Sequence, residues 1–82
     1  MTKEEIISKI NAFLIEEFEL EQEQLVPSAH LKNDLGIDSL DFVDIIVIIE
    51  KNFGFKVKGE DMVNVKTLQD FYEYVIARAK TE

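Results

Sequence analysis

The chain has 82 residues, a length that suits one domain with a single modest core. It contains no cysteine, so disulfides and cysteine-ligated zinc are excluded, and any thiol chemistry would require an attached group. The net charge of −8 is uneven, because residues 1–50 contain 12 acidic side chains against three lysines. Such a surface repels phosphate backbones and favours partners with lysine and arginine patches, so we expect proteins rather than nucleic acids as partners.

The first apolar residues do not resemble a signal peptide, because Glu4, Glu5 and Lys9 interrupt them. The longest apolar run covers residues 45–49 and is too short to span a membrane. We therefore expect a cytoplasmic, soluble and monomeric protein that forms one domain over residues 1–82. A helix cap as early as Thr2 further indicates a free-standing chain.

The first helix is predicted by the capping box of Thr2 and Glu5, which places its start directly after Met1. Apolar residues at three- and four-residue spacing extend it to about residue 18, namely Ile6, Ile7, Ile10, Leu14 and Phe18. A long connection then runs to about Asp38 and contains the only proline, Pro27. We expect four apolar residues to pin this connection onto the helices: Val26, Leu31, Leu35 and Ile37.

The second helix is expected from Ser39 to Phe53, and Asp38 with Asp41 provides its start signal. One apolar stripe is sufficient to bury it: Phe42, Ile45, Ile46, Ile49 and Phe53. A second stripe, flanked by Asp44 and Glu50, consists of Leu40, Val43 and Val47. This second stripe indicates either a helix buried more deeply than its neighbours or an exposed docking surface rimmed by acids. The sequence leaves both open.

The remaining chain predicts a loop, a short helical turn and a last helix. Gly54 suits the end of the second helix, and residues 55–58 are expected as a loop. Residues 59–65 are expected to form the turn, with Met62 and Val65 facing inward. Thr67 and Asp70 then start the last helix, and Arg78 and Lys80 suit the negative end of its dipole. Its inward face is expected to hold the apolar residues at helical spacing: Leu68, Phe71, Tyr72, Val75, Ile76 and Ala79. The predicted fold class is all-α: a small up-down bundle of three longer helices plus one short helix, with a long loop between the first two.

Ser39 is the most informative candidate residue, because it falls where helical N–H groups lack partners and an anion would be stabilised. The sequence places no general base near Ser39 that would activate its hydroxyl. The single histidine, His30, is predicted to be an ordinary loop residue. The acids around Ser39 do not match the spacing of an EF-hand, so we expect no specific metal site. Ser39 therefore reads as a residue that another protein modifies, and we expect no catalytic activity.

The stretch Asp34-Leu35-Gly36-Ile37-Asp38-Ser39-Leu40-Asp41 resembles the signature of acyl carrier proteins. The resemblance extends to size, acidity, helix order, the long first loop and the entry into the last helix at residues 66–68. It implies that Ser39, preceded by Asp38, receives a 4′-phosphopantetheine arm from coenzyme A through a phosphopantetheinyl transferase. It further implies that the arm carries acyl thioesters between synthase enzymes with basic docking patches, in fatty acid biosynthesis.

The resemblance also assigns roles on the helices. The positions shown to partner enzymes are Leu40, Asp41, Val43, Asp44, Val47 and Glu50. The positions around the acyl chain are Phe42, Ile45, Ile46, Ile49 and Phe53, faced by Leu68, Phe71 and Val75. A dedicated carrier of a polyketide or other specialised pathway is the close alternative, because Lys51 stands where many fatty-acid carriers have an acid. An unmodified acidic adaptor is a more distant one.

Overall fold

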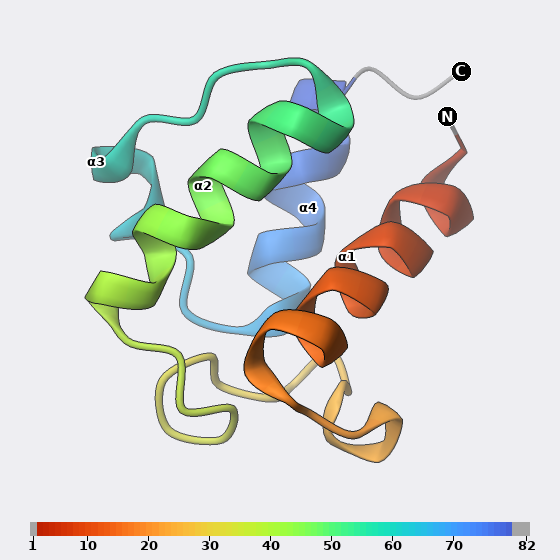
Figure 1. Ribbon diagram of the computed structural model, residues 1–82, viewed down its shortest axis with the longest axis vertical. Helices are drawn as coiled ribbons and strands as arrows, with labels where there is room; N and C mark the ends of the chain where they lie inside the picture. The colour runs from red at the N-terminus through yellow and green to blue at the C-terminus, as the bar shows by residue number, and fades with distance from the viewer. Residues whose placement is uncertain (1, 80–82) are drawn as a thin grey trace.

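The computed structural model describes residues 2–79, which form a bundle of four α-helices and one 3₁₀ turn (Figure 1). The elements are α1 (Lys3–Phe18), η1 (Gln22–Gln24), α2 (Ser39–Phe53), α3 (Gly59–Met62) and α4 (Leu68–Ala79). Three helices are long and α3 has four residues, so the predicted fold class is confirmed. In Figure 1, α1 runs opposite to α2 and α4, with α1 against α4 and α2 against α3.

Local caps fix the helix starts where the sequence predicts them. Thr2 and Glu5 form the expected capping box at α1, in which the Glu5 N–H donates to Thr2 Oγ1 at 3.1 Å. Thr67 and Asp70 do the same at α4, where the Asp70 N–H donates to Thr67 Oγ1 at 3.2 Å. Gly54 ends α2 with φ of 75°, a conformation that glycine adopts without steric cost. The loop over residues 55–58 is also confirmed.

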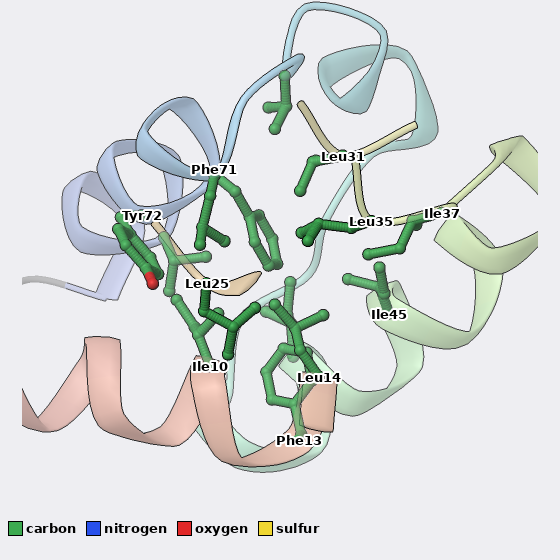
Figure 2. Packing of buried hydrophobic residues seen from close by; sticks show 14 of the residues in the cluster. Ile10, Phe13, Leu14, Leu25, Leu31, Leu35, Ile37, Ile45, Phe71 and Tyr72 are labelled. Carbon is green, nitrogen blue, oxygen red and sulfur yellow. The ribbon is translucent and has the colours of Figure 1, made fainter. Parts of the chain in front are cut away.

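The core joins α1, α2 and α4 through the long first loop, and Figure 2 shows loop side chains converging with helical ones. Leu31, Leu35 and Ile37 are buried as predicted. The prediction for Val26 is wrong, because its side chain is 45% exposed while that of Leu25 is 8% exposed. The 3₁₀ turn explains this shift, since its last hydrogen bond, from Leu25 N–H to Gln22 O, turns Leu25 inward.

Backbone hydrogen bonds attach the long loop to the segment that enters α4. The Leu31 N–H donates to Lys66 O, and the Leu68 N–H donates to Ala29 O, both at 2.9 Å. The Ile37 N–H in turn donates to Leu31 O at 2.8 Å. These bonds hold Ile37, and therefore the start of α2, at a defined place on the bundle.

Candidate functional site

The start of α2 is closed by a reciprocal pair of carboxylates. Asp38 Oδ1 accepts the N–H groups of Leu40 and Asp41 at 3.0 and 3.1 Å, and Asp41 Oδ2 accepts the Asp38 N–H at 3.1 Å. Ser39 is the first residue of the helix that follows. This confirms the predicted start signal and fixes the backbone on both sides of Ser39.

The same geometry bears on the expectation that the free N–H groups of this helix start would hold an anion on Ser39, because it shows which of these groups already have a partner. Two of these donors, from Leu40 and Asp41, already bind the Asp38 carboxylate. The helix dipole still favours negative charge here, but Asp38 itself is the anion that these two amides stabilise. An anion on Ser39 would therefore stand beside an occupied cap.

The turn that leads into this site uses His30 and Asp34 as structural groups. Asp34 Oδ2 accepts the His30 N–H at 2.7 Å, and His30 Nδ1 accepts the Asn33 N–H at 3.2 Å. Gly36 has φ of 71°, which allows the chain to bend back toward Ile37. The prediction that His30 is an ordinary loop residue agrees with these bonds, because its ring nitrogen holds the turn together.

A pocket of about 480 Å³ opens between α2, α3 and the two loops that meet near Asp38. Most of its lining is apolar, and the polar side chains lie at the loop end. The residues that line it are His30, Leu31, Lys32, Ile37, Asp38, Phe42, Val43, Ile46, Gly59, Met62, Val63, Val65 and Lys66. It therefore begins one residue before Ser39 and follows α2 toward α3.

Two of the eight residues assigned from the resemblance to an acyl pocket, Phe42 and Ile46, line this space. Five others have no solvent exposure and belong to the closed core: Ile45, Ile49, Leu68, Phe71 and Val75. Phe53 is half-buried and packs on Phe55, with ring centroids 6.3 Å apart. Across the pocket from α2 lie Met62 and Val65, which the sequence predicts to face inward and which are both buried.

The second apolar stripe of α2 is exposed. Leu40, Val43 and Val47 are 79%, 59% and 50% exposed, and Asp44 and Glu50 beside them are exposed too. We call these five residues the exposed strip. Its exposure excludes the alternative in which α2 is buried on this side as well.

Comparisons with known proteins match nearly the whole chain. A family model described as "Phosphopantetheine attachment site" matches residues 8–75. A protein named "Acyl carrier protein" from Thermotoga maritima is 36% identical over 74 residues, which cover 90% of this chain and 91% of the relative. Proteins with the same name from Thermosynechococcus vestitus and Cyanidium caldarium are each 33% identical, with 92% and 93% of this chain covered and 93% and 88% of the relatives.

The chain belongs to the acyl carrier protein family. A member of this family carries a covalently attached 4′-phosphopantetheine group and is a carrier rather than a catalyst. The attached group supplies the thiol on which an acyl group is carried, which this chain needs because it has no cysteine.

The residues present fit such a group. The pocket beside α2 has a polar end at Asp38, which suits the polar arm, and is apolar along Phe42, Ile46 and Met62, which suits the hydrocarbon part of a carried acyl group. Within residues 2–79 no group of three or more His, Asp or Glu side chains could hold a metal ion, and no helix is long and apolar enough to cross a membrane.

Proposed function

We propose that Ser39 is the residue that carries the 4′-phosphopantetheine arm. The observation that supports this most directly is its position: Ser39 opens α2 between Asp38, which lines the pocket, and Leu40, which is exposed. The chain has two other serines, Ser8 within α1 and Ser28 in the long loop, and neither is next in the chain to a residue that lines this pocket. An arm on Ser39 can reach both solvent and the apolar space beside it.

The attachment transfers a phosphopantetheine group from coenzyme A. The Ser39 hydroxyl oxygen forms a bond to the phosphorus that bears pantetheine, the diphosphate bond of coenzyme A breaks, and adenosine 3′,5′-bisphosphate leaves. The hydroxyl proton passes to a base of the transferase, because the carboxylate of the preceding residue, Asp38, already accepts two backbone N–H groups. A separate enzyme is therefore expected to perform this step.

The acyl chain on the arm is proposed to lie in the pocket, against Phe42, Ile46 and Met62. The fully buried side chains behind this wall, such as Ile45 and Ile49, form its support. A hydrocarbon chain that enters this space removes apolar surface from water at about 25 cal/mol per Å². Loading should therefore stabilise the folded protein.

The exposed strip is proposed to bind the partner enzymes, namely the phosphopantetheinyl transferase and the enzymes that load and elongate the acyl group. Its valines offer apolar contact, and Asp44 and Glu50 attract basic patches and speed association. Asp41 is half-buried and its carboxylate accepts the Asp38 N–H, so it contributes mainly by holding the start of α2.

For the pathway, we propose fatty acid biosynthesis, which the apolar lining of the pocket supports. The exposed Lys51, Lys56 and Lys58 favour the second candidate, a dedicated carrier of a polyketide or other specialised pathway. These lysines make the C-terminal end of α2 and the following loop basic. Partner enzymes that require acidic residues there would bind this protein less tightly. Comparing holo protein loaded with a saturated chain and with a keto or hydroxy chain separates the two: the chain that raises the melting temperature more is the better fit.

The attachment is tested by incubating the unmodified protein with coenzyme A and a broad-specificity transferase and measuring its intact mass. Ser39→Ala is compared with Ser28→Ala, a matched change at an exposed serine of the long loop. We expect one added phosphopantetheine on wild type and Ser28→Ala and none on Ser39→Ala. Modification of Ser39→Ala would refute the assignment, and folded wild type that is never modified would favour the adaptor.

A further inference from the structure

The short helix α3 is one wall of the pocket and depends on tertiary contacts for its place. It has four residues, and its first residue is preceded by Lys58, whose side chain makes no capping hydrogen bond. A helix of this length is not stable by itself, because nucleation costs more than its few hydrogen bonds return. Met62 anchors the inner side of α3, with 1% exposure, and lines the pocket together with Gly59 and Val63.

Asp61 anchors the other side of α3 to α4. Its Oδ2 accepts the Tyr74 hydroxyl at 3.0 Å and Arg78 Nη2 at 3.1 Å, and the Arg78 guanidinium lies 4.9 Å from the centre of the Tyr74 ring. The Asp61 side chain is 27% exposed, so these bonds are partly shielded from water. Among residues 2–79 this is the only ion pair, although the chain is rich in acids.

The two anchors, Asp61 and Met62, are adjacent in the chain, so a displacement of one displaces the other. Asp61 binds α4, and the next residue, Met62, faces the pocket. The Tyr74 hydroxyl remains a donor at ordinary pH, because burial and its bond to Asp61 raise the pKa of Tyr74. A shift of Asp61 away from α4 would carry Met62 with it and change the width of the pocket between α2 and α3.

We propose that Asp61, Tyr74 and Arg78 form a latch that sets the position of α3 and thereby determines how much of the acyl chain the pocket holds. They are positioning residues, because none of the three lines the pocket and they act through Met62. The proposal rests on the proposed function, since it assumes that the acyl chain enters this pocket. The contacts between α3 and α4 would then determine the length of acyl chain that the pocket holds, independently of the start of α2.

Tyr74→Phe tests the latch, because it removes one hydroxyl and keeps the ring under Arg78. Tyr72→Phe is the matched control: it makes the same chemical change on the same helix, but the Tyr72 hydroxyl donates to Asn11 of α1. Asp61→Asn is a second variant that weakens the bond to Arg78. All three are full-length chains.

The first measurement is hydrogen exchange in the protein without its arm, at the amides of Asn64 and Val65, which donate to Asp61 O and Met62 O at the end of α3. Loss of one partly shielded hydrogen bond corresponds to about two- to fivefold faster local opening. In Tyr74→Phe and Asp61→Asn we expect exchange at these two amides to accelerate more than exchange at the amides of α1. In Tyr72→Phe we expect no acceleration at these two amides. Equal exchange in all variants would overturn the latch.

The second measurement is the rise in melting temperature when the arm is loaded with an octanoyl chain, compared with the unloaded holo form. We expect Tyr74→Phe and Asp61→Asn to change this rise, and Tyr72→Phe to keep it while lowering both melting temperatures together. An unchanged rise in Tyr74→Phe would refute the link between the latch and the acyl chain. Failure of the attachment proposal is distinguishable, because wild type would then never be loaded, whereas the exchange of α3 would still be measured.

Discussion

Replacement of Asp38 by alanine tests how the start of α2 is built. The Asp38 carboxylate accepts two backbone N–H groups, those of Leu40 and Asp41, at 3.0 and 3.1 Å. Alanine leaves both donors without this partner, whereas Asp38→Asn keeps an acceptor oxygen at the same position. The two variants therefore separate the hydrogen bonds of the cap from its charge.

The magnitude follows from the number of bonds lost and from their exposure. Removal of a side-chain helix cap costs about 0.5–2 kcal/mol, and Asp38 binds two amides, so we expect about 1–2 kcal/mol for Asp38→Ala. The charge at a helix N-terminus contributes about 0.3–1 kcal/mol, which is the loss expected for Asp38→Asn. For a domain of this size, 1 kcal/mol corresponds to a change in melting temperature of about 4–8 °C.

Urea unfolding of the unmodified protein, followed by circular dichroism, measures both variants. Asp44→Ala is the control, because it removes an exposed acid on α2 that makes no capping bond, and it should change the free energy of unfolding by less than about 0.5 kcal/mol. If Asp38→Ala were as stable as Asp44→Ala, the carboxylate would not be the cap that holds the start of α2. If Asp38→Asn lost as much as Asp38→Ala, charge rather than hydrogen bonding would dominate.

Three further outcomes are expected. Hydrogen bonds from the backbone amides of Thr67 and Lys66 hold the pKa of Asp70 below its ordinary value of 3.8. Asp70 therefore adds stability that is present above this value and is lost as the pH falls through its lowered pKa. Asp70→Asn should flatten the acid side of a plot of the free energy of unfolding against pH, and an unchanged plot would contradict this. Val47→Asp changes a residue of the exposed strip that does not line the pocket, so it should keep the stability within about 0.5 kcal/mol yet slow enzymatic loading about tenfold, and equal loading rates would remove the exposed strip as a docking surface. Ile45→Ala should lower the free energy of unfolding by about 2–5 kcal/mol, because it truncates a core side chain. Ile46→Ala should lower it less but should reduce the stabilisation that an acyl chain provides. If instead Ile45→Ala reduced that stabilisation and Ile46→Ala did not, the acyl chain would lie in the core.

The helices and their starts were predictable from the sequence because their determinants are local. The two residues of each capping pair are three positions apart, as at Thr2 and Glu5 or Asp38 and Asp41, so spacing alone reveals the geometry. Apolar periodicity likewise predicted α2 over the residues that the structure assigns to it. What the periodicity left open, burial or exposure of the second stripe, depended on whether another element covers that face.

The pocket and the latch depend on contacts between distant segments, which local patterns do not encode. Ile45 and Ile46 fit the same apolar stripe, yet adjacent helical positions point about 100° apart, and only Ile46 meets the space left between α2 and α3. Asp61 lies 13 and 17 residues from Tyr74 and Arg78. Such spacings fit no local motif, so only the packing of α3 against α4 brings these groups together.

The most direct test of the central claim is to fragment the modified protein in a mass spectrometer and locate the added group along the chain. The sequence separates Ser28 from Ser39 by ten residues, so fragments that end between them assign the modification to one serine. The account predicts that every fragment that contains Ser39 bears the phosphopantetheine and that no fragment without Ser39 does. A modified fragment that lacks Ser39 would contradict it.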